Sequence, residues 1–129
     1  MENTPIPDDI RRYVLTRVPS VPYMEAILLL REKRDVCWEA EQVARRLYLS
    51  EGQADLLLQQ LRDDGVVQLI QGKTNAYSYA PVSGELAELI DRVAQAYIAN
   101  LIAISTLIHS RAGGKAKMLA EAFVWRKDK

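Results

Sequence analysis

The sequence is poor in the residues that form covalent cross-links and soft-metal sites. It has one cysteine, Cys37, and one histidine, His109, among 129 residues. A single cysteine excludes an internal disulfide and fits a reducing compartment, so we expect a cytoplasmic protein. One cysteine and one histidine cannot form a Cys/His metal cluster, and we therefore expect no metal site.

An excess of either positive or negative charge is also missing. The chain carries 17 basic and 17 acidic residues, and this balance gives no general reason to expect nucleic acid or an anionic membrane as a partner. The charge is unevenly distributed, because residues 1–65 have 9 basic and 12 acidic side chains (net −3) and residues 66–129 have 8 and 5 (net +3). Binding therefore has to be inferred from local patterns.

Signatures of enzymes are absent as well. Gly113 and Gly114 follow no predicted strand, so they do not form a phosphate-binding glycine loop. The neighbouring carboxylates Asp63 and Asp64 point in different directions from a helix and cannot share one substrate proton. We expect a protein that is not an enzyme and that uses no cofactor.

Neither a secretory signal nor a membrane span is evident. The segment 1–7 lacks the basic and apolar regions of a signal peptide. The apolar stretch 93–108 is shorter than the roughly 20 residues of a membrane span. It is also interrupted by polar residues: Gln95, Asn100, Ser105 and Thr106. We expect no membrane partner.

The chain does have enough apolar residues, 49%, to bury a core. We predict a mainly α chain with a small β-hairpin, of the α+β class, in three parts. Residues 1–19 form an arm and a short helix, residues 20–81 form a domain, and residues 82–129 form a helical dimerisation region.

The segment 38–81 carries the clearest local signals. Apolar residues at helical spacing predict a helix near 39–48. Ser50 and Gln53 have the spacing of a capping box and predict a helix over 50–64, which Gly65 ends. The residues that follow predict a hairpin over 66–80, and the short segment 36–38 could pair with it.

A long helix is predicted over 84–110, followed by another over 115–126. The second half of the long helix has two apolar faces, and a helix of this kind needs two coverings. One can be the domain itself, and the other is a second copy of the chain. The predicted dimer interface comprises Tyr97, Ile98, Leu101, Ile102, Ser105, Ile108 and Phe123.

The pattern Val43-Ala44-Arg45-Arg46-Leu47-Tyr48, then 50–65, then the hairpin, resembles the winged helix-turn-helix superfamily, including MarR-type bacterial regulators. The resemblance covers roughly residues 20–81, and the long helix looks like the dimerising helices of those regulators. It implies a winged helix-turn-helix with an extra N-terminal helix and long C-terminal helices. It also implies a DNA-binding transcriptional regulator that acts as a dimer.

In this family the second helix of the motif, here 50–64, enters the major groove of double-stranded DNA, and the hairpin acts as a wing. Glutamines on that helix could read adenine bidentately. The resemblance implies these DNA contacts: Arg45, Arg46, Glu51, Gln53, Gln59, Gln60, Arg62, Lys73 and Asn75.

A protein partner is the alternative. No lysine or arginine occurs between Arg46 and Arg62, and residues 36–80 hold 4 basic and 6 acidic side chains. DNA affinity comes largely from neutralising phosphates, which this segment does poorly. Leu56 is expected to be exposed on the outer face of the motif helix, where it could dock a protein. An adaptor built mainly on the C-terminal helices is a third hypothesis.

Two single residues have competing interpretations. Cys37 could be a redox sensor, but its place between Val36 and Trp38 in a predicted strand favours a buried structural thiol. His109 could be pH-sensitive, but a histidine near a helix end is more simply explained by the helix dipole.

Overall fold

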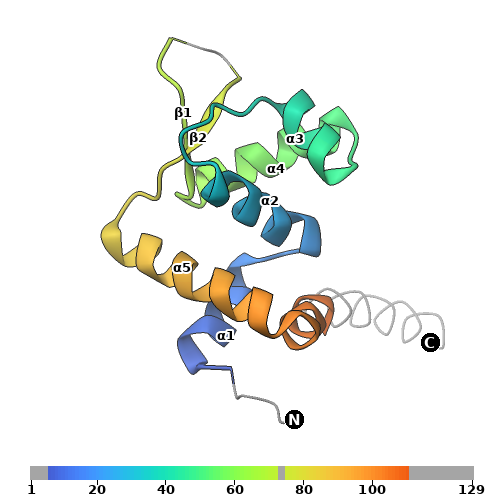
Figure 1. Cartoon of the computed structure of the whole chain (residues 1–129), viewed down its shortest axis with the longest axis vertical. Coiled ribbons are helices and arrows are strands. Elements are labelled where there is room, and N and C mark those ends of the chain that lie inside the picture. The colour runs from blue at the N-terminus through green and yellow to red at the C-terminus, as the bar shows by residue number, and fades with distance from the viewer. Residues whose placement is uncertain (1–5, 73–74, 111–129) are drawn as a thin grey trace, which may run out of the picture. The chain divides into compact units, whose positions relative to one another are not determined.

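A computed structural model describes residues 6–72 and 75–110 of the chain. It is mainly helical with one small antiparallel sheet, which confirms the predicted α+β class. The elements, shown in Figure 1, are α1 (Asp8–Arg17), α2 (Val21–Glu32), α3 (Ala40–Leu47), α4 (Glu51–Asp63), β1 (Val67–Leu69), β2 (Tyr77–Tyr79), α5 (Gly84–Ala99) and a further helix, Leu101–Ser110.

The chain divides into two compact units. Residues 22–94 form one, which contains nearly all of α2, then α3, α4, the hairpin and most of α5. Residues 1–21 and 95–129 form the other, whose described parts are 6–21 and 95–110. α5 therefore contributes to both units, with the division at Gln95.

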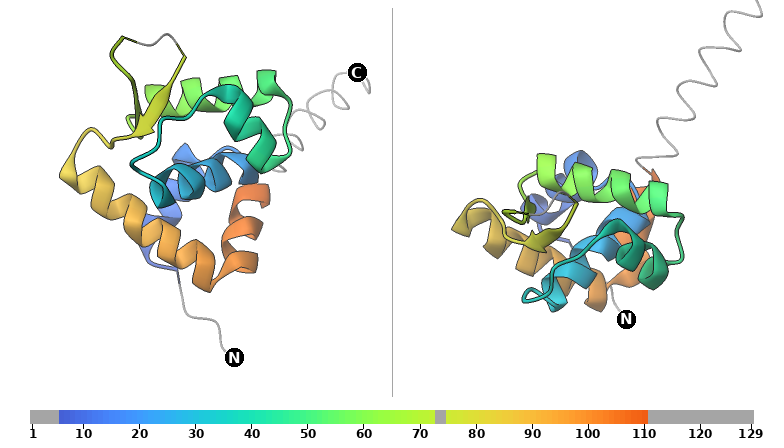
Figure 2. Two further views of the ribbon diagram at one scale, coloured as in Figure 1. Left: turned by 45° about the horizontal axis from the view of Figure 1, so that its top comes forward. Right: turned by 90° about the horizontal axis from the view of Figure 1, so that it is seen from above.

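The helices α3 and α4 pack against each other across a short turn (Figure 2). α4 begins with the predicted capping box: the Gln53 amide donates to Ser50 Oγ at 3.1 Å, and the Ser50 amide donates to Gln53 Oε1 at 3.0 Å. The predicted apolar stripe of α4 is buried and consists of Ala54, Leu57, Leu58 and Leu61. The capping box thus determines where this helix starts, and the spacing of its apolar residues determines which face it buries.

Tyr48 ends α3 in an unusual backbone conformation. Its φ of 59° and ψ of 46° are left-handed, and its side chain is 94% exposed. This region is unfavourable for a residue with a Cβ atom. Two amides, of Tyr48 and Leu49, donate to the Ala44 carbonyl and hold the turn in place.

Gly65 ends α4, as predicted, with a φ of 81°. The Val66 amide donates to the Leu61 carbonyl at 2.9 Å, which closes the helix end. A Cβ at position 65 would lie 2.9 Å from Val82 Cγ2, closer than real contacts. The position therefore requires glycine both for its backbone angle and for space.

The hairpin pairs Val67 with Tyr79 and Leu69 with Tyr77, and it projects from α3 and α4 in Figure 1. A single bridge joins it to Trp38, with the Trp38 amide donating to the Tyr77 carbonyl at 2.7 Å and the reverse bond at 2.8 Å. The predicted pairing of segment 36–38 with the hairpin is confirmed at Trp38 alone.

The prediction of a buried Cys37 is wrong. The thiol is exposed, whereas the neighbouring Trp38 is 3% exposed. Successive side chains of an extended segment point to opposite faces. Since Trp38 faces the core, Cys37 faces solvent.

The prediction of one helix over 84–110 is also wrong. α5 stops at Ala99, and the next helix, Leu101–Ser110, is bent from it by 110°. The break falls at Asn100, a polar residue of low helix propensity within the apolar stretch. Beyond the bend Ile104 and Ile108 are fully buried, so the second segment has a buried apolar face.

None of the described helices is by itself long and apolar enough to cross a bilayer. The bent pair α5 and Leu101–Ser110 reaches the required length and composition only when both helices are counted together.

Two glycine substitutions test how α4 begins and ends. Gly65→Ala should lower the free energy of unfolding by about 2 kcal/mol, because the left-handed conformation and the Val82 contact both oppose a Cβ. Gly52→Ala is the matched control, since no atom of the described residues lies within 4 Å of its new Cβ. It should raise stability by about 0.5 kcal/mol through helix propensity. Urea unfolding measures both, and equal effects would contradict the assignment of Gly65.

Candidate functional site

The outer face of α4 is the first candidate surface. Leu56 lies at the centre of this face and is 60% exposed. It is one helical turn beyond Gly52. Of the predicted DNA contacts on α4, the structure places these in exposed positions: Glu51, Gln53, Gln59, Gln60 and Arg62. The predicted exposure of Leu56 is confirmed.

The remaining predicted DNA contacts come from α3 and the hairpin. Arg45 and Arg46 are exposed on α3, and Asn75 is exposed at the hairpin. Lys73 lies outside the described residues. The predicted residues thus fall on three neighbouring elements, α3, α4 and the hairpin.

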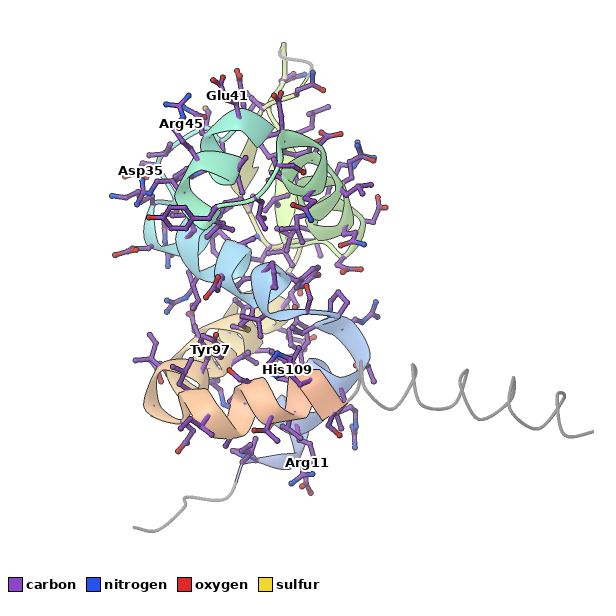
Figure 3. The ribbon with its side chains drawn as sticks, turned by 90° about the vertical axis from the view of Figure 1, so that its right-hand side faces the viewer. Arg11, Asp35, Glu41, Arg45, Tyr97 and His109 are labelled. Atoms are coloured by element: carbon purple, nitrogen blue, oxygen red, sulfur yellow. The ribbon has the colours of Figure 1, made fainter. Side chains whose placement is uncertain are left out.

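Several of these polar groups already have partners within the chain. Gln53 is used by the capping box of α4. Gln59 Nε2 donates to Asp55 Oδ2 at 2.8 Å. Arg45 pairs with Glu41 at 2.7 Å, and Figure 3 shows both side chains projecting from the outer side of α3. Part of the hydrogen-bonding capacity of each group is therefore already used within the chain.

A hollow of about 470 Å³ lies where α3, α4 and the hairpin meet. We call it the acidic hollow; its lining residues are Glu39, Ala40, Glu41, Glu51, Gly52, Asp55 and Asn75. Four of these are carboxylates, and none of them is basic. Among the described residues no basic side chain pairs with Glu39 or Glu51.

The start of both helices explains why carboxylates gather there. Glu41 lies in the first turn of α3 and Glu51 in the first turn of α4, and helix N-termini stabilise negative charge. The same positions place the charges side by side, because α3 and α4 pack together. Helix stability and a negative surface thus have one origin.

A second hollow, of about 360 Å³, is also lined by α3. We call it the basic hollow; its lining residues are Lys33, Val36, Trp38, Gln42, Arg45 and Arg46. The Arg46 guanidinium lies 5.8 Å from the centre of the Trp38 ring, a cation–π arrangement. Sequence alone does not reveal this site, because its residues come from the turn after α2, from the segment 36–38 and from α3.

The predicted dimer interface is divided by burial. Ile98, Leu101 and Ile102 are 71%, 51% and 79% exposed, and we call these three residues the apolar patch. Tyr97 and Ile108 are buried within the chain, Ser105 is half-buried, and Phe123 lies outside the described residues. The apolar patch spans the bend at Asn100.

One further pair of titratable groups, Tyr23 and Asp64, contributes to the fold. The Tyr23 hydroxyl donates to Asp64, which explains one of the two neighbouring carboxylates at the end of α4. His109 is exposed. Within residues 6–72 and 75–110 no three His, Cys, Asp or Glu side chains are grouped so that they could hold a metal ion.

Tyr79 joins the hairpin to a charged cluster. Arg31 pairs with Asp91 at 2.8 Å, and the Arg34 guanidinium lies 5.5 Å from the centre of the Tyr79 ring. Burial raises the pKa of the Tyr79 hydroxyl above its ordinary value, Asp91 acts in the same direction, and the two arginines oppose it. Its oxygen is buried without a hydrogen-bond partner among the described residues.

This raised pKa predicts a loss of stability at alkaline pH. Unfolded Tyr79 loses its proton near pH 10, about the usual tyrosine pKa, while the folded protein holds it to higher pH. The native state then binds more protons, so stability falls as the pH rises above about 10. Tyr79→Phe should reduce this fall without loss of stability at pH 8. Unfolding measured from pH 8 to 11 tests this, and equal pH dependence in both proteins would contradict it.

Comparison with known proteins adds no relative to these observations. No protein-family model, no curated protein and no solved structure matches the chain. The functional inference therefore depends on the charge, exposure and hydrogen bonding of the residues described above.

Proposed function

We propose that residues 20–81 form a winged helix-turn-helix that works as a protein-interaction module. Its binding face comprises the acidic hollow and Leu56, and its partner is a basic, amphipathic segment of another protein. The order α2, α3, α4 and hairpin supports the motif. The observation that carries the function is the group of four carboxylates where α3 and α4 begin.

Electrostatics favours a protein over DNA as the partner of this face. A motif helix presents its N-terminal residues to base edges, and the flanking surface meets phosphates. Here that end of α4 presents Glu51 and Asp55, beside Glu39 and Glu41 of the acidic hollow. Each uncompensated carboxylate repels phosphates, whereas lysine and arginine side chains are attracted.

Leu56 supplies the apolar part of the surface. Its side chain is 60% exposed and lies one helical turn from Gly52, which lines the acidic hollow. An exposed leucine gains free energy only when a partner covers it, at about 25 cal/mol per Å² of buried apolar surface. An apolar centre with charged surroundings matches the usual composition of a small protein interface.

Binding of defined peptides tests this proposal. A labelled helical peptide of lysines and leucines should bind the full chain, and the same peptide with glutamate for lysine should not. Leu56→Ser should weaken binding about tenfold, which corresponds to the loss of one apolar contact of moderate size. Glu51→Gln should weaken it about threefold at low salt, through one exposed charge.

Matched controls separate binding from folding. Val82→Ser changes an apolar side chain of similar exposure, 66%, away from the acidic hollow. Glu85→Gln changes another first-turn carboxylate, on α5. Both controls should retain binding, and equal losses in controls and test variants would refute the proposed face.

DNA binding by a dimer is the second candidate function, and the motif order favours it. Gln60 and Arg62 are exposed on α4 and could contact a duplex. Titration of genomic DNA fragments at low and moderate salt tests it. Sequence-selective binding that weakens in Arg62→Gln would favour this candidate, whereas absence of selective binding at both salt concentrations removes it.

Self-association through the apolar patch is proposed for either function. Its three residues lie within five positions of the chain and are all more than half exposed. Ile102→Glu should convert a dimer into a monomer in sedimentation experiments at tens of micromolar, because a buried unpaired carboxylate is costly. Val82→Glu is the control and should remain dimeric. A wild-type protein that sediments only as a monomer would exclude the dimer.

A further inference from the structure

The basic hollow has the charge of an anion site. Lys33, Arg45 and Arg46 contribute three positive charges, and none of the described residues that line the hollow is acidic. Each comes from an exposed position, so the charged groups can move toward a ligand. The hollow is thus opposite in sign to the acidic hollow, although α3 contributes residues to both.

The three cations differ in their ion pairing. Within the described part of the chain, neither Lys33 nor Arg46 forms an ion pair. Arg45 pairs with Glu41, but both side chains are well exposed, at 72% and 65%, and such pairs contribute only up to about 1 kcal/mol. A ligand with two negative charges would balance Lys33 and Arg46.

Trp38 provides a second, independent observation. It lines the hollow, it is 3% exposed, and its Nε1–H has no hydrogen-bond partner among the described residues. A buried donor without a partner costs about 1–3 kcal/mol. Arg46 lies over the ring and is itself exposed, so its movement toward an anion would change the surroundings of the indole.

We propose that the basic hollow binds a small phosphate monoester through Lys33, Arg45 and Arg46, with Trp38 and Val36 beside its organic part. Arginine forms paired hydrogen bonds with phosphate oxygens, and a dianionic phosphate matches the two unpaired cations. Val36 is 38% exposed and offers apolar contact. The hollow of about 360 Å³ has room for a compact ligand.

A compact dianion also fits the surroundings better than a nucleic-acid backbone does. A duplex carries a negative charge about every 1.7 Å and extends far beyond one site. Along α3 it would meet Glu41, which lines the acidic hollow. A small phosphate ester avoids that repulsion because its charge stays within the basic hollow.

Calorimetry with glycerol 3-phosphate, at ionic strength held constant with chloride, tests the site in the full chain. We expect saturable binding in the millimolar range or tighter. Arg46→Gln should weaken it about tenfold and Lys33→Gln about threefold, since each removes a charged contact. Arg62→Gln is the matched control, an exposed arginine of α4 outside the hollow, and it should bind within about twofold of wild type.

The indole resonance of Trp38 locates the ligand. Trp125→Phe removes the only other tryptophan, so one ¹⁵N-labelled indole signal remains. That signal should shift on titration, and the dissociation constant from the shift should equal the one from calorimetry. The proposal would be overturned if neither heat nor a shift were observed. It would also be overturned if Arg46→Gln and Lys33→Gln, both folded, bound the ester as tightly as wild type.

Competing ligands give two further outcomes. Succinate that binds as tightly as the phosphate ester would replace the phosphate assignment by a general dicarboxylate site. If duplex DNA displaces the ester, and Arg46→Gln weakens DNA binding as much as ester binding, the hollow would be assigned to a nucleic-acid backbone. Either result overturns the proposal, and weak competition by both supports it.

Discussion

The packing of α3 against α4 is the constraint on which the binding surfaces depend. The reciprocal hydrogen bonds of Ser50 and Gln53 set the first residue of α4, and the left-handed Tyr48 sets the angle of the turn before it. Together they bring two helix N-termini to one place. A helix N-terminus favours carboxylates, so the negative surface follows from the same geometry that buries Leu58 and Leu61.

Most of the unit formed by residues 22–94 could be predicted from sequence, because its sequence signals are local. The capping box, the glycine at position 65 and the alternation of the hairpin each involve residues only a few positions apart. The bend at Asn100 could not be predicted in this way. The apolar stretch around it is compatible with a straight helix, and the burial of Ile104 and Ile108 decides the outcome.

The candidate sites show the same limit. The exposure of Leu56 follows from helical period, and it was predicted from 3.6 residues per turn. Lys33, Trp38 and Arg46 meet only because Trp38 pairs with Tyr77 of the hairpin and the end of α2 lies nearby. A charge count along the chain averages over such sites. It gives a net charge of zero, although the surface has an acidic and a basic hollow.

Cys37 has a consequence for work with the purified protein. The alternation that turns Trp38 into the core leaves the thiol exposed, and an exposed thiol can be oxidised or can join two copies through a disulfide. A covalent pair formed in air would sediment as a dimer whatever the apolar patch does. The same accessibility makes Cys37 a unique attachment point for a spectroscopic label, one residue away from the indole of the basic hollow.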